Sequence, residues 1–408
     1  MLEGGRTGDG PSRRYTLEHP ELGTGPVPIE PYISVPYFEA ERQALFRKAW
    51  LFAGRVQEIP EAGDYFVRDI EVLRTSVIVV RGRDGTVRCF HNVCVHRGNK
   101  LVWSREGRSA RFTCKYHGWT YADDGRLIGV VEEDMFFGLE KRCSHLSSVR
   151  TEIWQGFIFI SLAGDVAPSV ADFLGDVDAL VDGYPFDSFD VCFSYRARLR
   201  ANWKVLVDSQ QEGYHAKTLH SRSLPGFLTN RAEPSRHTVD MRLFRYNRLI
   251  SYFGNREAVP TPSAIKAFSY GPAVSKFAGG GTPKGLNPSA HPDWAFDEYV
   301  LFPNMQLLLF GGMYIVHVMW PVSVDESIWE ARAYLPKATD LAQRFSLEYS
   351  KVLLRDAWLE DGSTLEATQQ GLESGAITHQ HLQDQELLIR HSAKVIDDLV
   401  TGRADLLS

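Results

Sequence analysis

Cysteine is scarce in this sequence. The 408 residues contain five cysteines: Cys89, Cys94, Cys114, Cys143 and Cys192. An odd and sparse set does not suit a disulfide framework, and such frameworks belong mainly to secreted proteins. We therefore expect free thiols and a reducing, cytoplasmic environment.

Long apolar runs are also missing. The nearest approach, residues 307–320, is interrupted by Gly311 and Gly312 and contains His317. A membrane-spanning helix needs about 20 consecutive apolar residues. The first 14 residues are polar and rich in glycine, without the apolar core of a secretory signal. We expect neither a membrane span nor a secretory signal.

Charge of one sign is not in large excess. The 45 Lys and Arg residues against 51 Asp and Glu residues give a net charge of −6. This balance gives no indication of a nucleic-acid-binding surface. The hydrophobic content of 44% is ordinary for a globular protein. At 408 residues the chain is too long for one compact core, so we expect two domains.

The few cysteines that are present include two that lie beside histidines. Cys94 and His96 form a C-x-H pair, and Cys114 and His117 form a C-x-x-H pair further along the chain. This mixed set and order are typical of a Rieske [2Fe–2S] centre, in which thiolates hold one iron and imidazoles the other. Such a centre accepts and donates single electrons.

Zinc is the alternative, because it also binds two cysteines and two histidines. The residues after each pair favour the cluster. Gly98 follows the first pair, and Gly118 and Trp119 follow the second. Glycine lets the backbone approach a bulky group, so that amide N–H groups can reach the cluster sulfurs.

A second metal site is indicated by His215 and His220. On a continuous helix, positions five apart differ by about 140°, so the helix must end or bend between them if both bind one ion. We expect His215 on the helix and His220 just beyond it, with Glu212, three residues before His215, on the same helical face. Asp361 is the best candidate for an anionic third ligand. Two histidines and one carboxylate form the facial triad of non-haem Fe(II) oxygenases. The alternative is a helix end where histidines face the carbonyl dipole.

These motifs occur together in one family. The chain resembles the catalytic α subunit of the Rieske non-haem iron oxygenases, the aromatic-ring-hydroxylating dioxygenases, over residues 37–372. The matching motifs are C-x-H-R-G at 94–98, C-x-x-H-G-W at 114–119, N-W-K at 202–204, E-x-Y-H-x4-H at 212–220 and E-D-x4-E-x2-Q-x-G-L at 360–372.

The resemblance implies a role for each site residue. The cluster ligands would be Cys94, His96, Cys114 and His117, and the ligands of a mononuclear Fe(II) would be His215, His220 and Asp361. Glu360 competes with Asp361 as third ligand, but the family pattern favours Asp361 and leaves Glu360 on a solvated helix face.

The resemblance also implies an assembly. Glu212 would bridge His117 of a neighbouring subunit to His215, which requires a homotrimer, with or without small β subunits. This chain departs from the family at Asp208, Ser209 and Gln210, where relatives often have Glu-Asn-aromatic. Any role of that asparagine is therefore in doubt here.

The expected fold class is α+β. We predict an all-β Rieske domain at residues 50–163, and a catalytic domain made of residues 1–49 and 164–408, in which helices flank an antiparallel sheet. Residues 256–292 are rich in Pro, Gly and Ser and predict a long surface loop or lid. From residue 340 onward the apolar spacing predicts a helix. His317, in an apolar strand, is expected in the core or in a pocket wall.

The expected function is that of a terminal oxygenase. The chain has no dinucleotide fingerprint or flavin motif. Electrons from NAD(P)H would therefore arrive through a reductase, directly or by way of a ferredoxin. With O2 they would dihydroxylate a small aromatic or hydrophobic ring substrate.

We expect the substrate pocket to draw on residues 301–320 and 256–292. The apolar run at residues 307–316 favours such a substrate, although Arg242 or Arg245 offers an anchor for a carboxylate. One alternative is a Rieske monooxygenase or O- or N-demethylase that acts on a hydrophobic or methylamine substrate. A more distant alternative is a protein that only transfers electrons.

Overall fold

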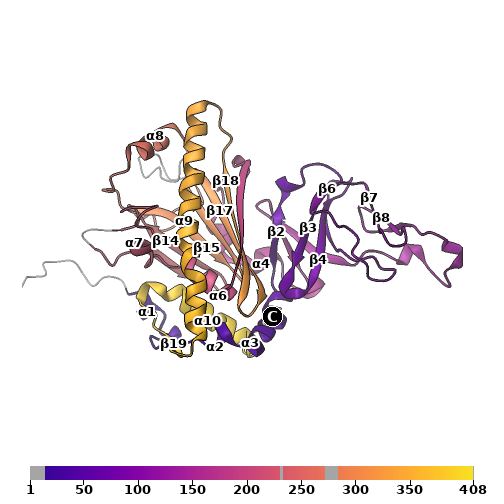
Figure 1. The fold of residues 1–408 in the computed structure, drawn as a ribbon, viewed down its shortest axis with the longest axis horizontal. Helices are drawn as coiled ribbons and strands as arrows, with labels where there is room; N and C mark the ends of the chain where they lie inside the picture. Colours follow the sequence, from indigo (N-terminus) through magenta and orange to yellow (C-terminus); the bar gives the residue numbers. More distant parts are fainter. Residues whose placement is uncertain (1–13, 230–232, 272–283, 408) are drawn as a thin grey trace, which may run out of the picture.

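The computed structural model describes residues 14–229, 233–271 and 284–407. It confirms the predicted α+β class, with an all-β part and a larger part in which helices cover a sheet (Figure 1). Within the described residues, no helix is long and apolar enough to cross a membrane.

The all-β part is built on a seven-stranded antiparallel sheet with the order β2-β11-β10-β5-β4-β3-β6. Its strands are β2 (Leu51–Arg55), β3 (Asp64–Ile70), β4 (Thr75–Arg81), β5 (Val87–His91), β6 (Glu106–Arg108), β10 (Ser148–Trp154) and β11 (Phe157–Ser161). A three-stranded sheet extends from it, formed by β7 (Arg111–Thr113), β8 (Thr120–Ala122) and β9 (Leu127–Gly129). The two Cys–His motifs lie in the turns after β5 and after β7.

The larger part has its own seven-stranded antiparallel sheet, in the order β12-β18-β17-β16-β15-β14-β13. Its strands are β12 (Val191–Leu199), β13 (Thr238–Leu243), β14 (Arg248–Phe253), β15 (Trp294–Leu301), β16 (Met305–Phe310), β17 (Met313–Ser323) and β18 (Glu326–Leu335). Apolar side chains on the central strands are almost completely buried, which places the main core against this sheet.

Helices cover this sheet and close its lower end (Figure 1). The predicted late helix is α9 (Leu341–Glu373), which runs across one face of the sheet. The other helices are α1 (Tyr15–Glu18), α2 (Glu30–Ile33), α3 (Val35–Glu41), α4 (Val170–Leu174), α5 (Asp176–Leu180), α6 (Trp203–Gln210), α7 (Ala216–Leu219), α8 (Pro262–Tyr270) and α10 (Leu387–Val400).

The N-terminal segment packs against the C-terminal part of the chain. The short strand β1 (Val27–Pro28) pairs with β19 (His379–Gln380). The buried Glu41 of α3 accepts hydrogen bonds from Lys204 Nζ at 2.6 Å and from Trp203 Nε1 at 3.0 Å. These contacts support the assignment of residues 1–49 to the larger domain, as far as those residues are described, and that assignment stays a proposal.

The predicted boundary at residues 163/164 lies between β11 and α4, and it stays a proposal. One apolar core includes residues from both sides of it, such as Phe157 and Tyr314, whose ring centroids are 6.0 Å apart. The predicted loop at 256–292 is not uniform, because residues 262–270 form α8. Residues 272–283 of that loop lie outside the described residues.

Candidate metal centres

The two Cys–His motifs form a matched pair of tight turns. In each turn the glycine N–H donates to the cysteine carbonyl, from Gly98 to Cys94 and from Gly118 to Cys114, both at 3.0 Å. Both glycines adopt positive φ angles, of 76° and 72°. That backbone region strongly favours glycine, which explains the C-x-H-R-G and C-x-x-H-G sequences.

The thiols in these turns are buried and have polar partners. Cys94 and Cys114 are each 2% exposed. Tyr121 Oη lies 3.3 Å from Cys94 Sγ, and Asn99 Nδ2 donates to Cys114 Sγ at 3.6 Å. Burial raises the pKa of Cys114, but donors that include the Tyr116 N–H and Asn99 outweigh burial and leave that pKa below its ordinary value. The surroundings of Cys114 therefore favour a thiolate, the form that binds metal, whereas burial raises the pKa of Cys94.

The histidines lie next to each other, with ring centroids 4.6 Å apart. His96 stacks on Trp119 at 4.8 Å, with an interplanar angle of 7°. Its Nδ1 atom is buried and has no hydrogen-bond partner. A buried nitrogen without a partner is costly unless something binds it. These residues therefore fit a Rieske cluster.

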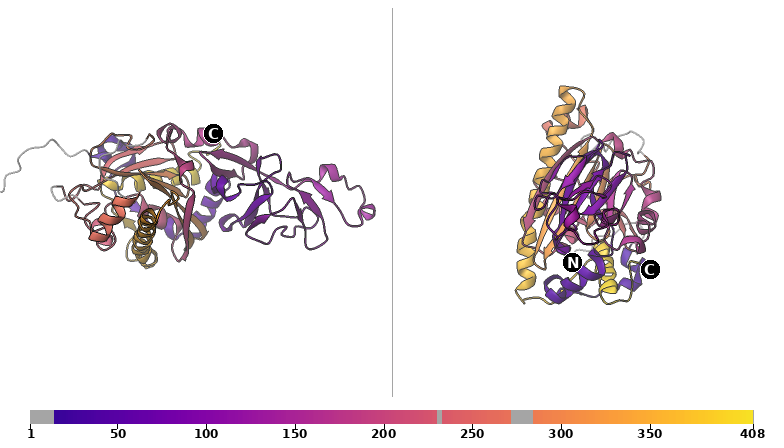
Figure 2. Two further views of the ribbon diagram at one scale, coloured as in Figure 1. Left: turned by 90° about the horizontal axis from the view of Figure 1, so that it is seen from above. Right: turned by 90° about the vertical axis from the view of Figure 1, so that its right-hand side faces the viewer.

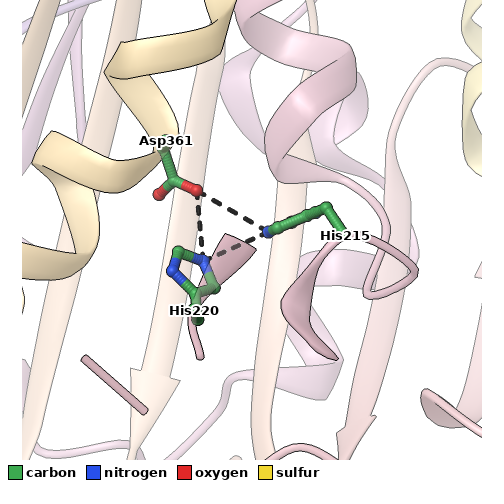
Figure 3. A group of neighbouring side chains, drawn as sticks. All are labelled: His215, His220 and Asp361. Carbon is green, nitrogen blue, oxygen red and sulfur yellow. Dashed lines mark hydrogen bonds and ion pairs between the residues drawn. The ribbon is translucent and has the colours of Figure 1, made fainter. Parts of the chain in front are cut away.

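The second group is formed by His215, His220 and Asp361 (Figure 3). One ligand atom from each can be chosen so that all lie within 4.8 Å of one another. Asp361 Oδ1 is 3.1 Å from His220 Nε2 and 3.6 Å from His215 Nε2, and the two Nε2 atoms are 3.2 Å apart. The three sequence-predicted ligands therefore meet at one point.

The helices are divided differently from the expectation: α6 ends well before His215, and a second, short helix lies between the two histidines and ends just before His220. Helix α6 ends at Gln210, and α7 is a single turn with His215 at its N-cap and His220 at its C-cap. The expectation that His215 lies on the helix and shares a helical face with Glu212 is wrong. Glu212 and His215 still contact each other, because both lie in the segment between α6 and α7.

Carboxylates orient both imidazoles. His215 Nδ1–H donates to Glu212 Oε1 at 2.6 Å, and His220 Nδ1–H donates to Glu360 Oε2 at 3.0 Å. Both Nε2 atoms therefore face Asp361, and in the neutral rings they carry the lone pair, an arrangement typical of histidines that bind metal. Burial lowers the pKa of His215, but Glu212 and Asp361 outweigh this effect and raise it.

Glu360 corrects one expectation. It does not lie on a solvated helix face, because its side chain is only 19% exposed and accepts from His220 and from the Ser223 N–H at 3.2 Å. It is therefore a positioning residue for His220. The alternation of helical faces could not reveal this, since the partner residues lie on α7 and in the loop beyond it.

A pocket opens beside the three candidate ligands. Its walls are mainly apolar and aromatic, from Leu224, Phe227, Leu228, Tyr252, Phe268, Phe296, Leu308, Phe310, Ile315, Leu353, Leu354 and Trp358. Both segments predicted to form the pocket contribute, residues 301–320 through Leu308, Phe310 and Ile315, and residues 256–292 through Phe268 of α8. Arg242 and Arg245 do not line the pocket, and Arg242 instead pairs with Asp240 at 2.8 Å. The suggested arginine anchor is therefore wrong for this pocket.

Besides the candidate ligands and the adjoining Gln210 and Glu212, two buried polar side chains interrupt these apolar walls. Glu298 is 1% exposed; its Oε2 accepts from Tyr252 Oη at 2.8 Å, and its Oε1 has no partner. Burial raises the pKa of Glu298 to about 8. The second is His317, which is fully buried, as expected from the sequence. Glu298 was not predicted from the sequence, in which it is one of two adjacent charged residues, Asp297 and Glu298, in a strand of mainly apolar residues.

The two candidate metal centres lie far apart within one chain. The turns after β5 and β7 are near one end of the long axis, whereas α7 and α9 belong to the other half (Figures 1 and 2). Two views at right angles agree on this separation. Two redox sites of these kinds nevertheless serve together in one class of enzyme, the Rieske non-haem iron oxygenases.

Comparison with known proteins agrees with that class. Residues 186–402 match the model of the family described as ring hydroxylating alpha subunit (catalytic domain), and residues 49–136 match the Rieske [2Fe-2S] domain. The chain belongs to the ring-hydroxylating α-subunit family, and it is an oxygenase. The alternative of a protein that only transfers electrons is therefore wrong.

Similar proteins include members with different substrates. The glycine betaine monooxygenase oxygenase subunit of Pseudomonas aeruginosa is 28% identical over 363 residues, which cover 85% of this chain and 82% of the relative.

Two solved structures show the same fold. The quaternary ammonium Rieske monooxygenase CntA in complex with L-carnitine gives a TM-score of 0.70 at 21% identity, covering 91% of this chain and 95% of that chain. Naphthalene 1,2-dioxygenase from Rhodococcus sp. bound to indole gives 0.71 at 21%, covering 95% and 97%. At this identity the likeness concerns the fold alone, so it does not choose between these substrates.

Proposed function

We propose that this terminal oxygenase is a monooxygenase that hydroxylates a carbon next to the nitrogen of a quaternary ammonium or methylamine substrate. This is the alternative from the sequence analysis, and we prefer it to dihydroxylation of an arene. The observation that carries it is the buried carboxylate of Glu298 among the aromatic walls of the pocket.

The pocket chemistry suits an organic cation. Aromatic faces attract a quaternary ammonium group through their quadrupoles, and Glu298 adds direct charge attraction in its ionised form. A neutral arene would leave Glu298 Oε1 without a partner, which is costly for a buried polar atom. The similarity to a glycine betaine monooxygenase over 85% of the chain supports the same substrate class.

We assign the metal ligands as the sequence predicted them. Cys94, His96, Cys114 and His117 would hold the [2Fe–2S] cluster, and His215, His220 and Asp361 would hold Fe(II). When bound, the cluster supplies single electrons and the mononuclear iron supplies the place where O2 is activated. Glu212 and Glu360 hold the two histidines with Nε2 toward the ion.

We also propose that electrons cross between subunits. Glu212 is 8% exposed and already contacts His215, so its carboxylate can bridge to His117 of a neighbouring copy. The separation of the two sites within one chain supports a ring, and we propose a homotrimer, with or without small β subunits. NAD(P)H would supply the electrons through a reductase, directly or by way of a ferredoxin.

The overall reaction consumes one O2, two electrons and two protons. One oxygen atom enters a C–H bond beside nitrogen, and the other leaves as water. The resulting N–C–OH group breaks down to an amine and an aldehyde, which is formaldehyde if a methyl group is attacked.

The test is oxygen uptake coupled to a reductase, with trimethylammonium compounds and arenes as substrates. We expect aldehyde in proportion to O2 consumed with the ammonium compounds, and one labelled oxygen atom per product from 18O2. Formation of a cis-diol from an arene, together with no turnover of any ammonium compound, would refute the proposal.

A further inference from the structure

The pocket contains a second recognition element, opposite in character to Glu298. Among the described residues that line the pocket, the buried polar atoms without a partner are Glu298 Oε1 and His317 Nε2. We propose that His317 is a specificity-determining residue that donates a hydrogen bond from Nε2–H to an oxygen of the substrate. This inference rests on the proposed function and narrows its substrate class.

The proton on Nε2 is fixed by a neighbour. Trp329 Nε1–H donates to His317 Nδ1 at 2.8 Å, and an indole nitrogen can only donate. Nδ1 must therefore be the acceptor, and a neutral imidazole then carries its single proton on Nε2. Burial lowers the pKa of His317 to about 4, which agrees with a neutral ring.

The ring has little freedom to turn away. It stacks on Trp329, with centroids 5.4 Å apart and planes 26° from parallel, and it meets Trp358 edge to face at 5.5 Å. His317 and Ile315 both line the pocket, two residues apart on β17, as expected for one face of a strand. Nε2–H is therefore a preoriented donor in an otherwise apolar wall.

The register of the sheet separates this donor from Glu298. Glu298 pairs with Leu308, and Leu308 pairs with Ile315, so His317 lies two strands and two residues away. Strands about 4.8 Å apart and residues about 3.4 Å apart put the two Cα atoms roughly 12 Å from each other. One ligand several heavy atoms long can therefore contact both side chains.

The substrate class follows from these two contacts. An aromatic cage with a carboxylate binds the ammonium end, and a neutral N–H donor binds an oxygen at the other end. A carboxylate is the strongest acceptor for such a donor. The pocket therefore fits a zwitterion, such as a trimethylammonium carboxylate, better than a simple alkyltrimethylammonium ion.

Three probes of equal length test the two ends separately. γ-Butyrobetaine carries both charges, butyltrimethylammonium lacks the carboxylate, and 5,5-dimethylhexanoate replaces the nitrogen by carbon. Dissociation constants are measured by calorimetry on the iron-loaded enzyme. A charged hydrogen bond predicts that γ-butyrobetaine binds about ten- to a hundredfold more tightly than butyltrimethylammonium.

Substitutions of His317 and Trp329 test whether His317 causes the preference for γ-butyrobetaine over butyltrimethylammonium. His317→Phe should remove it by weakening γ-butyrobetaine alone, and His317→Gln, which keeps an N–H donor, should restore part of it. Trp329→Phe removes the group that fixes the proton and should reduce the preference while leaving His317 in place. It also provides a second variant if His317→Phe fails to fold.

The outcomes separate this inference from the proposed function. If His317→Phe weakens both ammonium probes equally, or lowers kcat without changing either dissociation constant, the inference is overturned and the proposed function is untouched. If 5,5-dimethylhexanoate binds as tightly as γ-butyrobetaine, the cation preference fails, whereas His317 keeps its role. If none of the three probes binds, both proposals fail.

Discussion

Glu298 is a carboxylate held where a carboxylate is costly. It is almost fully buried, with one oxygen bonded to Tyr252 and the other unpaired. A raised pKa in the folded state means that the folded chain binds this proton more tightly than the unfolded chain does. The free energy of unfolding therefore decreases as the pH rises from about 4.5 to about 8. Binding of a cationic ligand beside Glu298 would offset this loss of stability.

Glu298→Gln should thus stabilise the protein and weaken ligand binding. At pH 7 we expect the free energy of unfolding to rise by about 2–3 kcal/mol, because Glu298 must bind a proton on folding at this pH, whereas the amide is neutral in both states. Affinity for butyltrimethylammonium should fall at least tenfold. In the wild type that affinity should increase with pH toward 8, and in the variant it should not. Urea denaturation and calorimetry at pH 6 and pH 8 measure both effects.

Glu330→Gln is the matched control. Glu330 is also buried, but it lies among Arg68, Arg196 and Arg332 and outside the pocket. Burial raises its pKa, but these arginines outweigh burial and lower it, so this carboxylate is ionised. Its replacement should therefore reduce stability and leave ligand affinity unchanged. Equal effects of the two substitutions would contradict the role given to Glu298.

Glu212 and Glu360 each accept from one histidine of the His–His–Asp group, yet we expect different consequences when they are changed. Glu212→Gln should keep both metals and lose at least 90% of NADH-coupled turnover, since an amide bridges the two imidazoles poorly. Loss of a positioned group between two reaction partners typically lowers a rate by an order of magnitude or more. Metal analysis, the visible spectrum and oxygen uptake together measure it.

Glu360→Gln serves as the comparison. Glu360 contacts His220 and Ser223, so its loss should weaken iron binding by about 10–100-fold and leave the cluster spectrum unchanged. If Glu212→Gln turned over at the normal rate with NADH, the bridging role would be wrong.

At the scale of elements, α9 contributes to both the substrate pocket and the candidate iron site. It supplies Trp358 to the pocket wall and Asp361 to the candidate ligands, one helical turn apart. Gly362 follows Asp361 in the middle of this helix. Glycine inside a helix costs roughly 0.5–1 kcal/mol relative to alanine.

Gly362→Ala should therefore stabilise the protein. A Cβ at this position would meet Trp329 Cζ3 at 3.8 Å, an ordinary van der Waals contact. We expect the free energy of unfolding to rise by about 0.5–1 kcal/mol with iron content unchanged. Gly371→Ala, where a Cβ would meet nothing within 4 Å, is the control and should give a similar gain. A loss of stability at 362 alone would mean that the helix near Asp361 cannot be shifted.

The sequence could predict the parts of the site that lie within one element, and not those that depend on how the elements pack together. The Cys–His turns are local, so spacing and glycines predict them directly. Asp361 is remote from His220 in sequence, and its assignment needed the family pattern. For Glu298 neither source sufficed: Asp297 and Glu298 point to opposite faces of β15, and Asp297 is held by Ser251, Asn287 and Trp294. Alternation separates them, but only the folded sheet tells which face borders the pocket.

The same reasoning applies to the fold. Antiparallel strands and the late helix follow from apolar spacing and were expected. The pairing of β1 with β19 was not, because two-residue strands leave no recognisable pattern and form only when the ends of the chain meet.

At the scale of the whole molecule, the separated metal centres predict complementation between inactive copies. Cys114→Ser should abolish the cluster, and His220→Ala should abolish the mononuclear iron. Each variant alone should be inactive. Mixed assemblies, co-expressed with two different affinity tags and purified on both, should regain activity because a cluster in one copy serves iron in another. Mixed assemblies without activity would show that electrons stay within one chain.

The distance between the two sites in each chain also has a genetic consequence if the copies form a closed ring. A copy without its cluster silences the iron of its neighbour, whereas a copy without its iron silences only itself. A misfolded copy that still joins the ring would lack both metal centres, so its own iron site and that of its neighbour would be inactive. A cell that makes damaged and intact copies together would then lose activity more steeply than the proportion of damaged copies rises, and such alleles would behave as dominant negatives.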